Sequence, residues 1–453
     1  MASTFLTRTV SGSDSTYTYK RNTVSVWLKR SGLGNACFFE GWYSNAFATQ
    51  VYFLSSGELV LNAASSTAGS AFQIQTNKKF RDVNSWYNIV ISIDTTDVTS
   101  ADRCKIYVNG VRETSFSSAS YPNQNASVQW SGTGNTQFVG RRESGGAGLY
   151  YDGAMSYLAY IDGTAELPTI FGETDTTTGQ WKIKTDITPS VAWGNFGFLI
   201  LKNGNSLTDE STNTNNFTLG GGTLTNTLDC PSNVFATLNA LAKPGTGNLP
   251  SFGNGNTHYN KTATGAGNNS MIVATLGATT GKFYYEYKMN DSNAFIAGIS
   301  TLDNTYYDAN GGSMNTASGV GVAYQSSGNK IINGTSTSYG NSYGSGNIIG
   351  VAFDLVNNFI YFSKDGVWQN SGDPTSGSSG TGGIGIATTG ITYSPFAQNN
   401  GYNSPSSVYY NFGNGYFGTT AVTSAGTAGS TPGVFEYDVP SGYEPLTTKG
   451  LNA

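Results

Sequence analysis

Residues 347–368, NIIGVAFDLVNNFIYFSKDGVW, contain two apolar runs, at 348–353 and 359–362, and the dipeptide Asp365-Gly366. Short runs rich in β-branched and aromatic residues predict strands. Asp-Gly after such a run predicts a hairpin, because both central residues of a type I′ turn need positive φ. The stretch therefore predicts consecutive antiparallel strands.

Similar short apolar runs, separated by turn residues, occur on both sides of this stretch. Comparable runs occupy 281–288, 295–299, 319–324 and 408–413. An earlier series lies at 23–29, 50–54, 59–61, 71–75, 86–94, 104–112, 138–141 and 151–163. Two ladders of short strands separated by turn residues predict an all-β chain with two antiparallel β-sandwich domains.

The composition agrees with this fold class and excludes others. Of the 453 residues only 11% are charged, against about 25% in ordinary soluble domains, so bundles and coiled coils are excluded. Lys and Arg number 23 and Asp and Glu 28, a net charge of −5 without a basic run, and we expect no nucleic-acid partner. A hydrophobic content of 38% is enough to bury a core.

The N-terminus and the cysteines bear on location. Residues 1–8 show no basic region before an apolar core, so no secretory signal is visible, and no apolar run is long enough to span a membrane. Cys37, Cys104 and Cys230 are far apart and odd in number, which argues against disulfides. We expect synthesis in a reducing cytosol and no membrane insertion.

The first ladder resembles a known family. The segments VSVWLKRS (24–31), WYNIV (86–90), KIYVNGV (105–111) and YDGAMSYLAYIDG (151–163) are similar to those of laminin-G-like, concanavalin A-type jelly rolls. The resemblance covers residues 1–165. It implies a jelly roll in which calcium often binds.

The second ladder resembles a SPRY domain over residues 250–420. Its segments follow the family's order: GKFYYE (281–286), AGI (297–299), GVGV (319–322), IIGVAFD (348–354) and IYFSKDGVW (360–368). The resemblance implies a bent β-sandwich whose loops bind proteins or peptides, without catalytic machinery.

The remaining segments complete a four-part organisation. Residues 166–249 form an Asn- and Thr-rich connector with short strands, and residues 421–453 form a C-terminal tail. The order of jelly roll, connector, SPRY domain and tail resembles structural proteins of tailed bacteriophages. This resemblance implies a virion-surface protein in a tail fibre, tail tip or head decoration, assembled in the host cytoplasm.

Catalytic groups are sparse. His258 is the single histidine, so neither a histidine metal cluster nor a Ser-His-Asp site is expected. Jelly-roll glucanases carry Glu-x-Asp-x-x-Glu on one strand, but only Glu436-Tyr437-Asp438 approaches this pattern, outside the jelly roll, and Glu40 and Glu58 stand alone. We expect no enzyme; a carboxylate pair from separate strands is the alternative, as in a polysaccharide depolymerase.

No cofactor is expected, but calcium binding is possible in principle. Asp94 and Asp97 would supply oxygen ligands if the resemblance to laminin-G-like domains extends to its metal. The alternative is that both are solvated turn residues.

Binding is the expected activity, because aromatic rings stack on sugars and uncharged polar groups bond to hydroxyls. The candidate ligand-binding residues sit beside Gly, Asn or Ser. They are Trp42, Tyr43, Tyr306, Tyr307, Tyr339, Tyr343, Trp368 and Tyr402. The alternatives are core positions, to which we assign Trp27, Trp86, Tyr107, Tyr285, Phe353 and Tyr361, or a subunit interface.

The expected partners follow from the resemblance to phage proteins. They are other virion proteins, a host-surface glycan or receptor, and further copies in a homo-oligomer, most simply a trimer. A purely structural decoration or cement protein is the alternative to host recognition.

Overall fold

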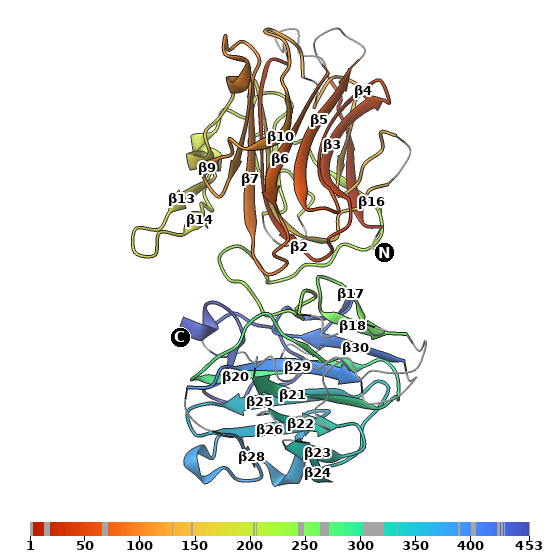
Figure 1. Cartoon of the computed structure of the whole chain (residues 1–453), viewed down its shortest axis with the longest axis vertical. Helices are drawn as coiled ribbons and strands as arrows, with labels where there is room; N and C mark the ends of the chain where they lie inside the picture. Colours follow the sequence, from red (N-terminus) through yellow and green to blue (C-terminus); the bar gives the residue numbers. More distant parts are fainter. Residues whose placement is uncertain are drawn as a thin grey trace. The chain divides into compact units, whose positions relative to one another are not determined.

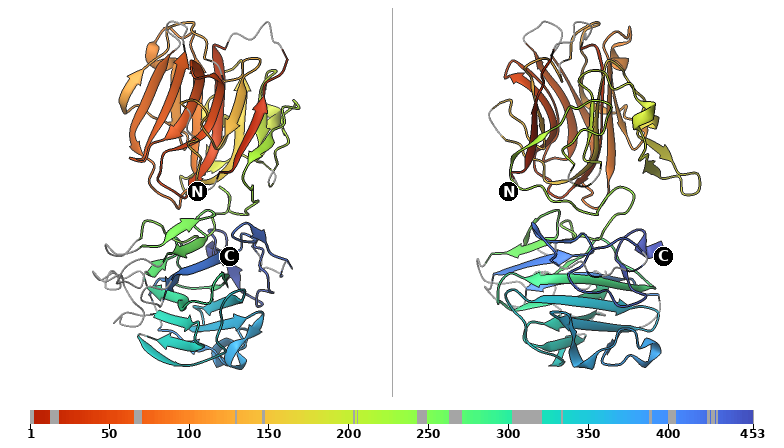
Figure 2. Two further views of the ribbon diagram at one scale, coloured as in Figure 1. Left: turned by 90° about the vertical axis from the view of Figure 1, so that its right-hand side faces the viewer. Right: turned by 180° about the vertical axis from the view of Figure 1, so that it is seen from behind.

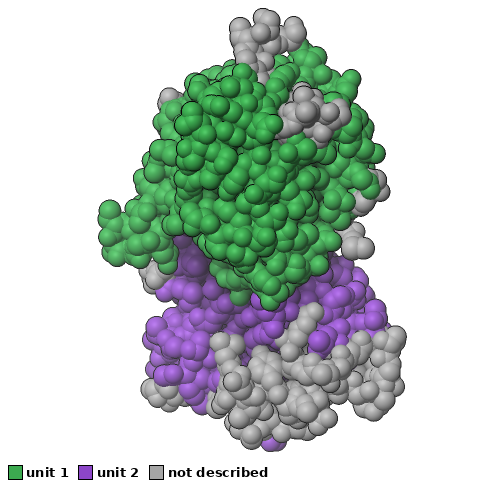
Figure 3. Space-filling view, turned by 45° about the horizontal axis from the view of Figure 1, so that its top comes forward, with its two compact units in different colours: residues 1–226 green, residues 227–453 purple. Residues whose placement is uncertain are grey.

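A computed structural model of the whole chain gives the fold. It describes residues 3–12, 19–65, 71–128, 130–145, 148–202, 204, 206–242, 249–262, 271–301, 321–332, 334–387, 390–399, 405–423, 426, 429 and 431–452. The chain divides into two compact units, residues 1–226 and 227–453 (Figure 3).

The first unit contains two large antiparallel sheets, seen in Figures 1 and 2. The eight-stranded sheet has the order β10 (Phe116–Ser120), β6 (Phe72–Lys79), β5 (Glu58–Ser65), β4 (Phe47–Phe53), β3 (Ala36–Ser44), β11 (Thr136–Val139), β1 (Phe5–Thr9) and β16 (Thr218–Gly221). The six-stranded sheet has the order β15 (Phe198–Ile200), β12 (Gly153–Asp162), β2 (Arg21–Arg30), β7 (Tyr87–Asp94), β8 (Cys104–Val108) and β9 (Val111–Arg112).

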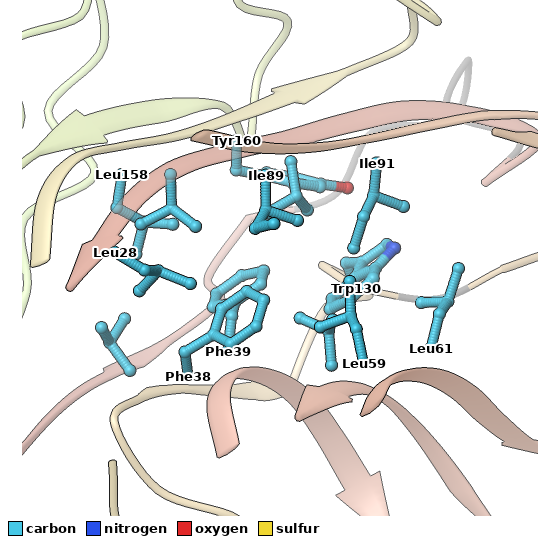
Figure 4. Packing of buried hydrophobic residues seen from close by; sticks show 14 of the residues in the cluster. Leu28, Phe38, Phe39, Leu59, Leu61, Ile89, Ile91, Trp130, Leu158 and Tyr160 are labelled. Carbon is cyan, nitrogen blue, oxygen red and sulfur yellow. The ribbon is translucent and has the colours of Figure 1, made fainter. Parts of the chain in front are cut away.

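The core of this unit lies between the two sheets. Figure 4 shows Leu28 and Ile89 of the six-stranded sheet on one side and Phe39 and Leu59 of the eight-stranded sheet on the other. Trp130, which lies outside the strands, is fully buried between them and stacks on Phe39 with 5.1 Å between ring centroids. Each strand thus turns alternate side chains inward, as the period of two requires.

Residues 166–226 add to both sheets. Strand β15 pairs with β12, and β16 pairs with β1. The hairpin of β13 (Gly172–Thr174) and β14 (Trp181–Ile183) lies beside β9 (Figure 1). The apolar side chains of this segment cover the outer face of the six-stranded sheet. That cluster comprises Val90, Tyr107, Ala159, Ile161, Phe171, Ile187, Trp193 and Leu199.

The second unit is also a two-sheet sandwich. One sheet has the order β17 (Ser251–Gly253), β18 (His258–Lys261), β30 (Ser406–Asn411), β20 (Lys282–Met289), β25 (Ile348–Asp354), β26 (Phe359–Lys364) and β27 (Val367–Trp368). Strand β28 (Ile384–Gly385) pairs with β26, and β33 (Glu444–Pro445) pairs in parallel with β20. The other sheet has the order β19 (Met271–Val273), β29 (Tyr393–Asn399), β21 (Phe295–Thr301), β22 (Gly321–Gln325), β23 (Asn329–Ile332) and β24 (Thr335–Ser338).

Segments at both ends of this unit belong to its packing. Phe235 forms a bridge to Thr447, and Leu238 lies in the core of the sandwich. On the outer face of the larger sheet, Phe435 and Tyr443 are fully buried against side chains of β20, β25 and β26. Strands β31 (Tyr416–Phe417) and β32 (Thr420–Ala421) form a further short hairpin.

The described helices are single 3₁₀ turns. They are η1 (Ser100–Asp102), η2 (Pro168–Ile170), η3 (Thr188–Ser190), η5 (Gln369–Ser371), η6 (Gly377–Ser379) and η7 (Gly450–Asn452). None of the helices in the described parts of the chain has the length and apolar character needed to cross a membrane.

The predicted fold class is confirmed, with two antiparallel β-sandwich units in sequence order. Both predicted hairpin turns form, because Asn109, Gly110, Asp365 and Gly366 all have positive φ. The aromatic residues assigned to the core are buried. They are Trp27, Trp86, Tyr107, Tyr285, Phe353 and Tyr361.

Candidate functional site

The outer face of the eight-stranded sheet in the first unit carries a row of polar side chains. Gln73, Asn62, Gln50 and Glu40 are cross-strand partners on β6, β5, β4 and β3. Their neighbours along each strand, such as Val51, point into the core. Because successive side chains alternate between faces, the row lies on the side away from the core.

The amides of this row form a continuous chain of hydrogen bonds. The Ser144 hydroxyl donates to Gln50 Oε1 at 3.3 Å, Gln50 Nε2 donates to Asn62 Oδ1 at 3.1 Å, and Asn62 Nδ2 donates to Gln73 Oε1 at 3.4 Å. Each bond polarises the next one, which strengthens the terminal donor. The chain ends on the Gln73 amide nitrogen, which is left to bond to a ligand or water.

Two half-buried aromatic residues lie on either side of the amide row on this face. Trp42 of β3 pairs with Ala48 of β4, and Tyr52 is four residues further along β4. At about 3.4 Å per residue the two rows they occupy are roughly 13 Å apart. The Trp42 indole N–H is buried and has no hydrogen-bond partner. The face therefore combines aromatic rings with uncharged donors and acceptors.

Glu40 sits at the end of the row, under the loop that follows β11. Its carboxylate accepts hydrogen bonds from the backbone N–H groups of Glu143 and of Ser144, the latter at 3.2 Å. Burial raises the pKa of Glu40, and these N–H groups and the nearby Arg142 oppose the rise. Glu143 pairs with Arg141 instead. Glu40 thus fixes the loop over the sheet, and both of its oxygens are occupied by the protein.

Of the predicted ligand-binding aromatics, Trp42 and Tyr43 lie at the site. Residues 40–45 could have formed a loop at the rim, but Trp42 and Tyr43 belong to strand β3, because residues 36–44 pair with β4 and β11. Trp42 faces the amide row. Tyr43 is 56% exposed and packs edge-on against Phe47 at the strand end.

Tyr339 and Tyr343 are not available to a ligand, contrary to the prediction. They are 8% and 6% exposed in the core of the second unit. The Tyr343 hydroxyl donates to the carbonyl of Tyr324 and accepts from Tyr287, and Tyr339 packs edge-on against Tyr324. Internal hydrogen bonds satisfy the buried phenol of Tyr343, whereas Tyr339 is buried by ring packing and its hydroxyl has no hydrogen-bond partner among the described residues.

Trp368 is half-buried on β27 and packs against the cluster that holds Phe435 and Tyr443. It therefore supports the C-terminal segment and is not an open loop aromatic. Tyr306, Tyr307 and Tyr402 lie outside the described residues.

The proposed calcium ligands make bonds within the protein. Asp94 pairs with Arg21 at 3.0 Å and accepts the Thr96 N–H, and Asp97 accepts the Thr99 N–H at 2.8 Å. These are the contacts of turn residues. Across the described part of the chain, no cluster of three or more His, Cys, Asp and Glu side chains has an arrangement that could hold a metal.

His258 and the cysteines show no catalytic arrangement. His258 Nε2 lies 2.9 Å from the Ser407 hydroxyl, its ring packs at a tilt against that of Tyr409, and burial lowers the pKa of His258. Cys37 and Cys104 are buried, Cys230 is half-buried, and all three are free thiols.

Sequence reasoning missed the main polar residues of the site, Gln50, Asn62, Gln73 and Arg142. The signal was present in the alternation of polar and apolar residues in 50–54 and 71–75. Only the pairing of β4, β5 and β6 shows that these amides form one row.

Comparison with known families identifies two domains. Residues 7–182 match the concanavalin A-like lectin/glucanases superfamily, and residues 282–383 match the SPRY domain. Domains of both kinds are typically binding or interaction domains, and no catalytic family is indicated. No curated protein matches the chain.

Several solved structures have similar parts. The SPRY domain of human HERC1 is 17% identical, with a TM-score of 0.26 over 34% of this chain and 87% of that one. The TRIM65 PSpry domain is 13% identical, with a TM-score of 0.28 over 39% and 91%. The heptameric SAP-like pentraxin of Limulus polyphemus is 20% identical, with a TM-score of 0.25 over 36% and 77%.

Proposed function

We propose that this chain is a carbohydrate-binding protein and that its ligand lies on the outer face of the eight-stranded sheet. The observation that carries the proposal is the hydrogen-bonded amide chain from Gln50 to Gln73, placed between the half-buried rings of Trp42 and Tyr52. Sugar rings stack on aromatic faces, and their hydroxyl groups bond to amides without any need for charge.

The mechanism is binding without reaction. Hydrolysis of a glycosidic bond needs two free carboxyl groups on either side of that bond. Glu40 is the carboxylate in the row, and the backbone holds both of its oxygens. The amide chain is set by strand pairing before any ligand arrives, which reduces the entropy lost on binding.

The proposed setting is the surface of a bacteriophage particle, in a tail fibre, tail tip or head decoration. The support is the order of a jelly roll, an Asn-rich segment and a SPRY domain, together with the low charge of the chain. Several copies in a homo-oligomer, most simply a trimer, would raise the avidity of weak sites for a host-surface glycan. The SPRY domain would contact other virion proteins or a host protein.

Binding to immobilised bacterial polysaccharides by the full chain tests the proposal. We expect Gln50→Ala and Trp42→Ala each to weaken binding about tenfold, because the first breaks the hydrogen-bonded amide chain and the second removes a stacking surface. Gln180→Ala, an exposed residue of the hairpin before β14, is the matched control. Equal binding by all three variants would contradict the site.

Two further measurements separate the rival functions. Release of reducing ends from a bound polysaccharide would identify a depolymerase. An antibody against residues 250–453 would locate the protein on purified particles, where label at the tail end supports host recognition and label over the head supports a cement protein. Particles without label would contradict the virion setting.

A further inference from the structure

Arg142 differs from every other arginine of the chain. All eight arginines lie within residues 1–226, and the structure describes each of them. Seven donate hydrogen bonds to carboxylates, amides or carbonyl groups. These are Arg8, Arg21, Arg30, Arg81, Arg103, Arg112 and Arg141. The guanidinium of Arg142 makes no hydrogen bond or ion pair with any described residue, and its Nε is buried without a partner.

The position of Arg142 ties it to the proposed binding face. It belongs to the loop that covers Glu40, and its guanidinium carbon lies 5.8 Å from the centroid of the Tyr52 ring. Tyr52 is one of the two aromatic residues beside the amide row. The cation is thus held against an aromatic face at one side of the site. The carboxylate of Glu40 interacts with Arg142 only through its charge, because its hydrogen bonds come from the loop backbone.

A guanidinium that makes no hydrogen bond within the protein can bind an anionic group of a ligand. Its planar fork of N–H groups matches a carboxylate or a sulfate, and such charge-assisted bonds are about twice as strong as neutral ones. Solvent-exposed arginines commonly pair with nearby acids, as Arg141 does with Glu143 two residues away in the same loop. The terminal Nη groups of Arg142 make no hydrogen bond with the described residues and remain able to bind an anion, although its Nε is buried.

We infer that the ligand is an acidic polysaccharide, in which a carboxylate or sulfate on one sugar unit binds Arg142 while hydroxyl groups of its neighbours bind the amide chain. This inference rests on the proposed function, because it assigns the charge of the glycan that occupies the same face. Gln50, Asn62 and Gln73 would select hydroxyl patterns, and Arg142 would select the anion.

Matched pairs of polymers test the inference with the full chain. The probes are polygalacturonate with its carboxyl-reduced form, and dextran sulfate with dextran. We expect the native chain to prefer the acidic member of at least one pair by about tenfold or more at low salt, because one charge-assisted contact is worth roughly that factor. Raising the ionic strength should reduce this preference.

Variants separate this inference from the proposed function. Arg142→Gln should abolish the preference and leave binding of the neutral polymer unchanged, whereas Arg21→Gln, at a distant ion pair, should leave both unchanged. The inference would be overturned if the native chain and Arg142→Gln both bound the two members of each pair equally. Loss of this binding in Gln50→Ala would then still support glycan binding at the proposed face. A native chain that binds none of the four polymers would overturn both. Circular dichroism of each variant verifies that it is folded.

Discussion

At the scale of single residues, Glu286 is a buried acid of the second unit with several hydrogen-bond donors around it. Its carboxylate accepts the backbone N–H groups of Glu436 and Tyr437, each at 2.9 Å, the Tyr284 hydroxyl at 3.0 Å and the Asn411 amide. The side chain is fully buried. It therefore joins strand β20 to the C-terminal segment about 150 residues later.

This carboxylate gives the fold a pH dependence. Burial raises the pKa of Glu286 from 4.5 to about 7, against the opposing hydrogen bonds. An acid whose pKa is higher in the folded chain holds its proton better there, so the contribution of Glu286 to stability is fully present below pH 4.5 and is lost as the pH rises toward 7. We expect a loss of about 3 kcal/mol across that window. Guanidinium unfolding at several pH values measures it, and an unchanged pH slope in Glu286→Gln would contradict the assignment.

Gly41 shows why a small residue stands in the middle of β3. A Cβ placed there would lie 2.3 Å from the backbone carbonyl oxygen of Trp130. The indole ring of Trp130 is buried between the sheets. Gly41→Ala must displace that backbone, and overpacking of this kind costs about 1–3 kcal/mol. Gly34→Ala meets no atom within 4 Å and is the control. Equal melting temperatures for the two variants would show that the backbone at Trp130 can be displaced without a measurable loss of stability.

Single residues are also where sequence reasoning was least reliable. Tyr339 and Tyr343 stand among glycine and serine, which favours exposed loops, yet both are core residues. The Tyr343 hydroxyl bonds to Tyr324 and Tyr287, and the Tyr339 ring packs against Tyr324, so both depend on residues of other strands. No local pattern could reveal those partners. Trp42 was proposed from the same kind of signal, a position beside glycine, serine and asparagine in residues 40–45, and it lies half-buried on a strand.

At the scale of elements, the hairpins were predictable because their signals are local. Asn109-Gly110 and Asp365-Gly366 adopt positive φ in tight turns, as these dipeptides indicate. The same turn at Gly110 also has a long-range role that no local signal gives. The ring of Trp181 lies over it, and the Trp181 indole N–H donates to Asn88 at 3.0 Å.

Gly110→Ala therefore affects two elements at once. A Cβ at this position would lie 2.5 Å from the Trp181 ring, and φ is +79°. We expect a loss of about 1–2 kcal/mol for the strained backbone, together with displacement of the β13–β14 hairpin. Gly163→Ala is the control, because Gly163 has a similar φ of +88° but a Cβ there would have no atom within 4 Å. Proteolysis within 172–183 should accelerate only in Gly110→Ala, and equal rates would contradict the docking of Trp181.

The pairings that close the sandwiches were beyond sequence reasoning. Strand β1 pairs with β16, which places Leu6 opposite Leu219, and β20 pairs with β33 near the C-terminus. Short strands such as β16 and β33 carry almost no periodic signal, because two to four residues cannot show alternation. The sequence pattern therefore predicts the fold class and most long strands, but not which distant segments complete each sheet.

At the scale of the whole molecule, two separate cores hold the chain. One lies between the sheets of residues 1–226 and the other within residues 227–453. The segment 166–249, expected as a connector, contributes to both: β15 extends the sheet of β12, and Leu238 lies in the second core. Each unit therefore carries the apolar contacts needed to fold independently.

Fragments of the chain test this division. We expect residues 1–226 to fold cooperatively as a fragment and residues 1–165 to fail. The shorter fragment lacks β15 and the cover of the six-stranded sheet. The large buried side chains that it loses include Phe171, Trp193, Phe198, Leu199 and Ile200. At about 2 kcal/mol each, this loss is comparable to the whole stability of a domain, roughly 5–15 kcal/mol. Calorimetry of both fragments measures it. A cooperative transition in 1–165 at the temperature of 1–226 would show that the segment after 165 is only a connector.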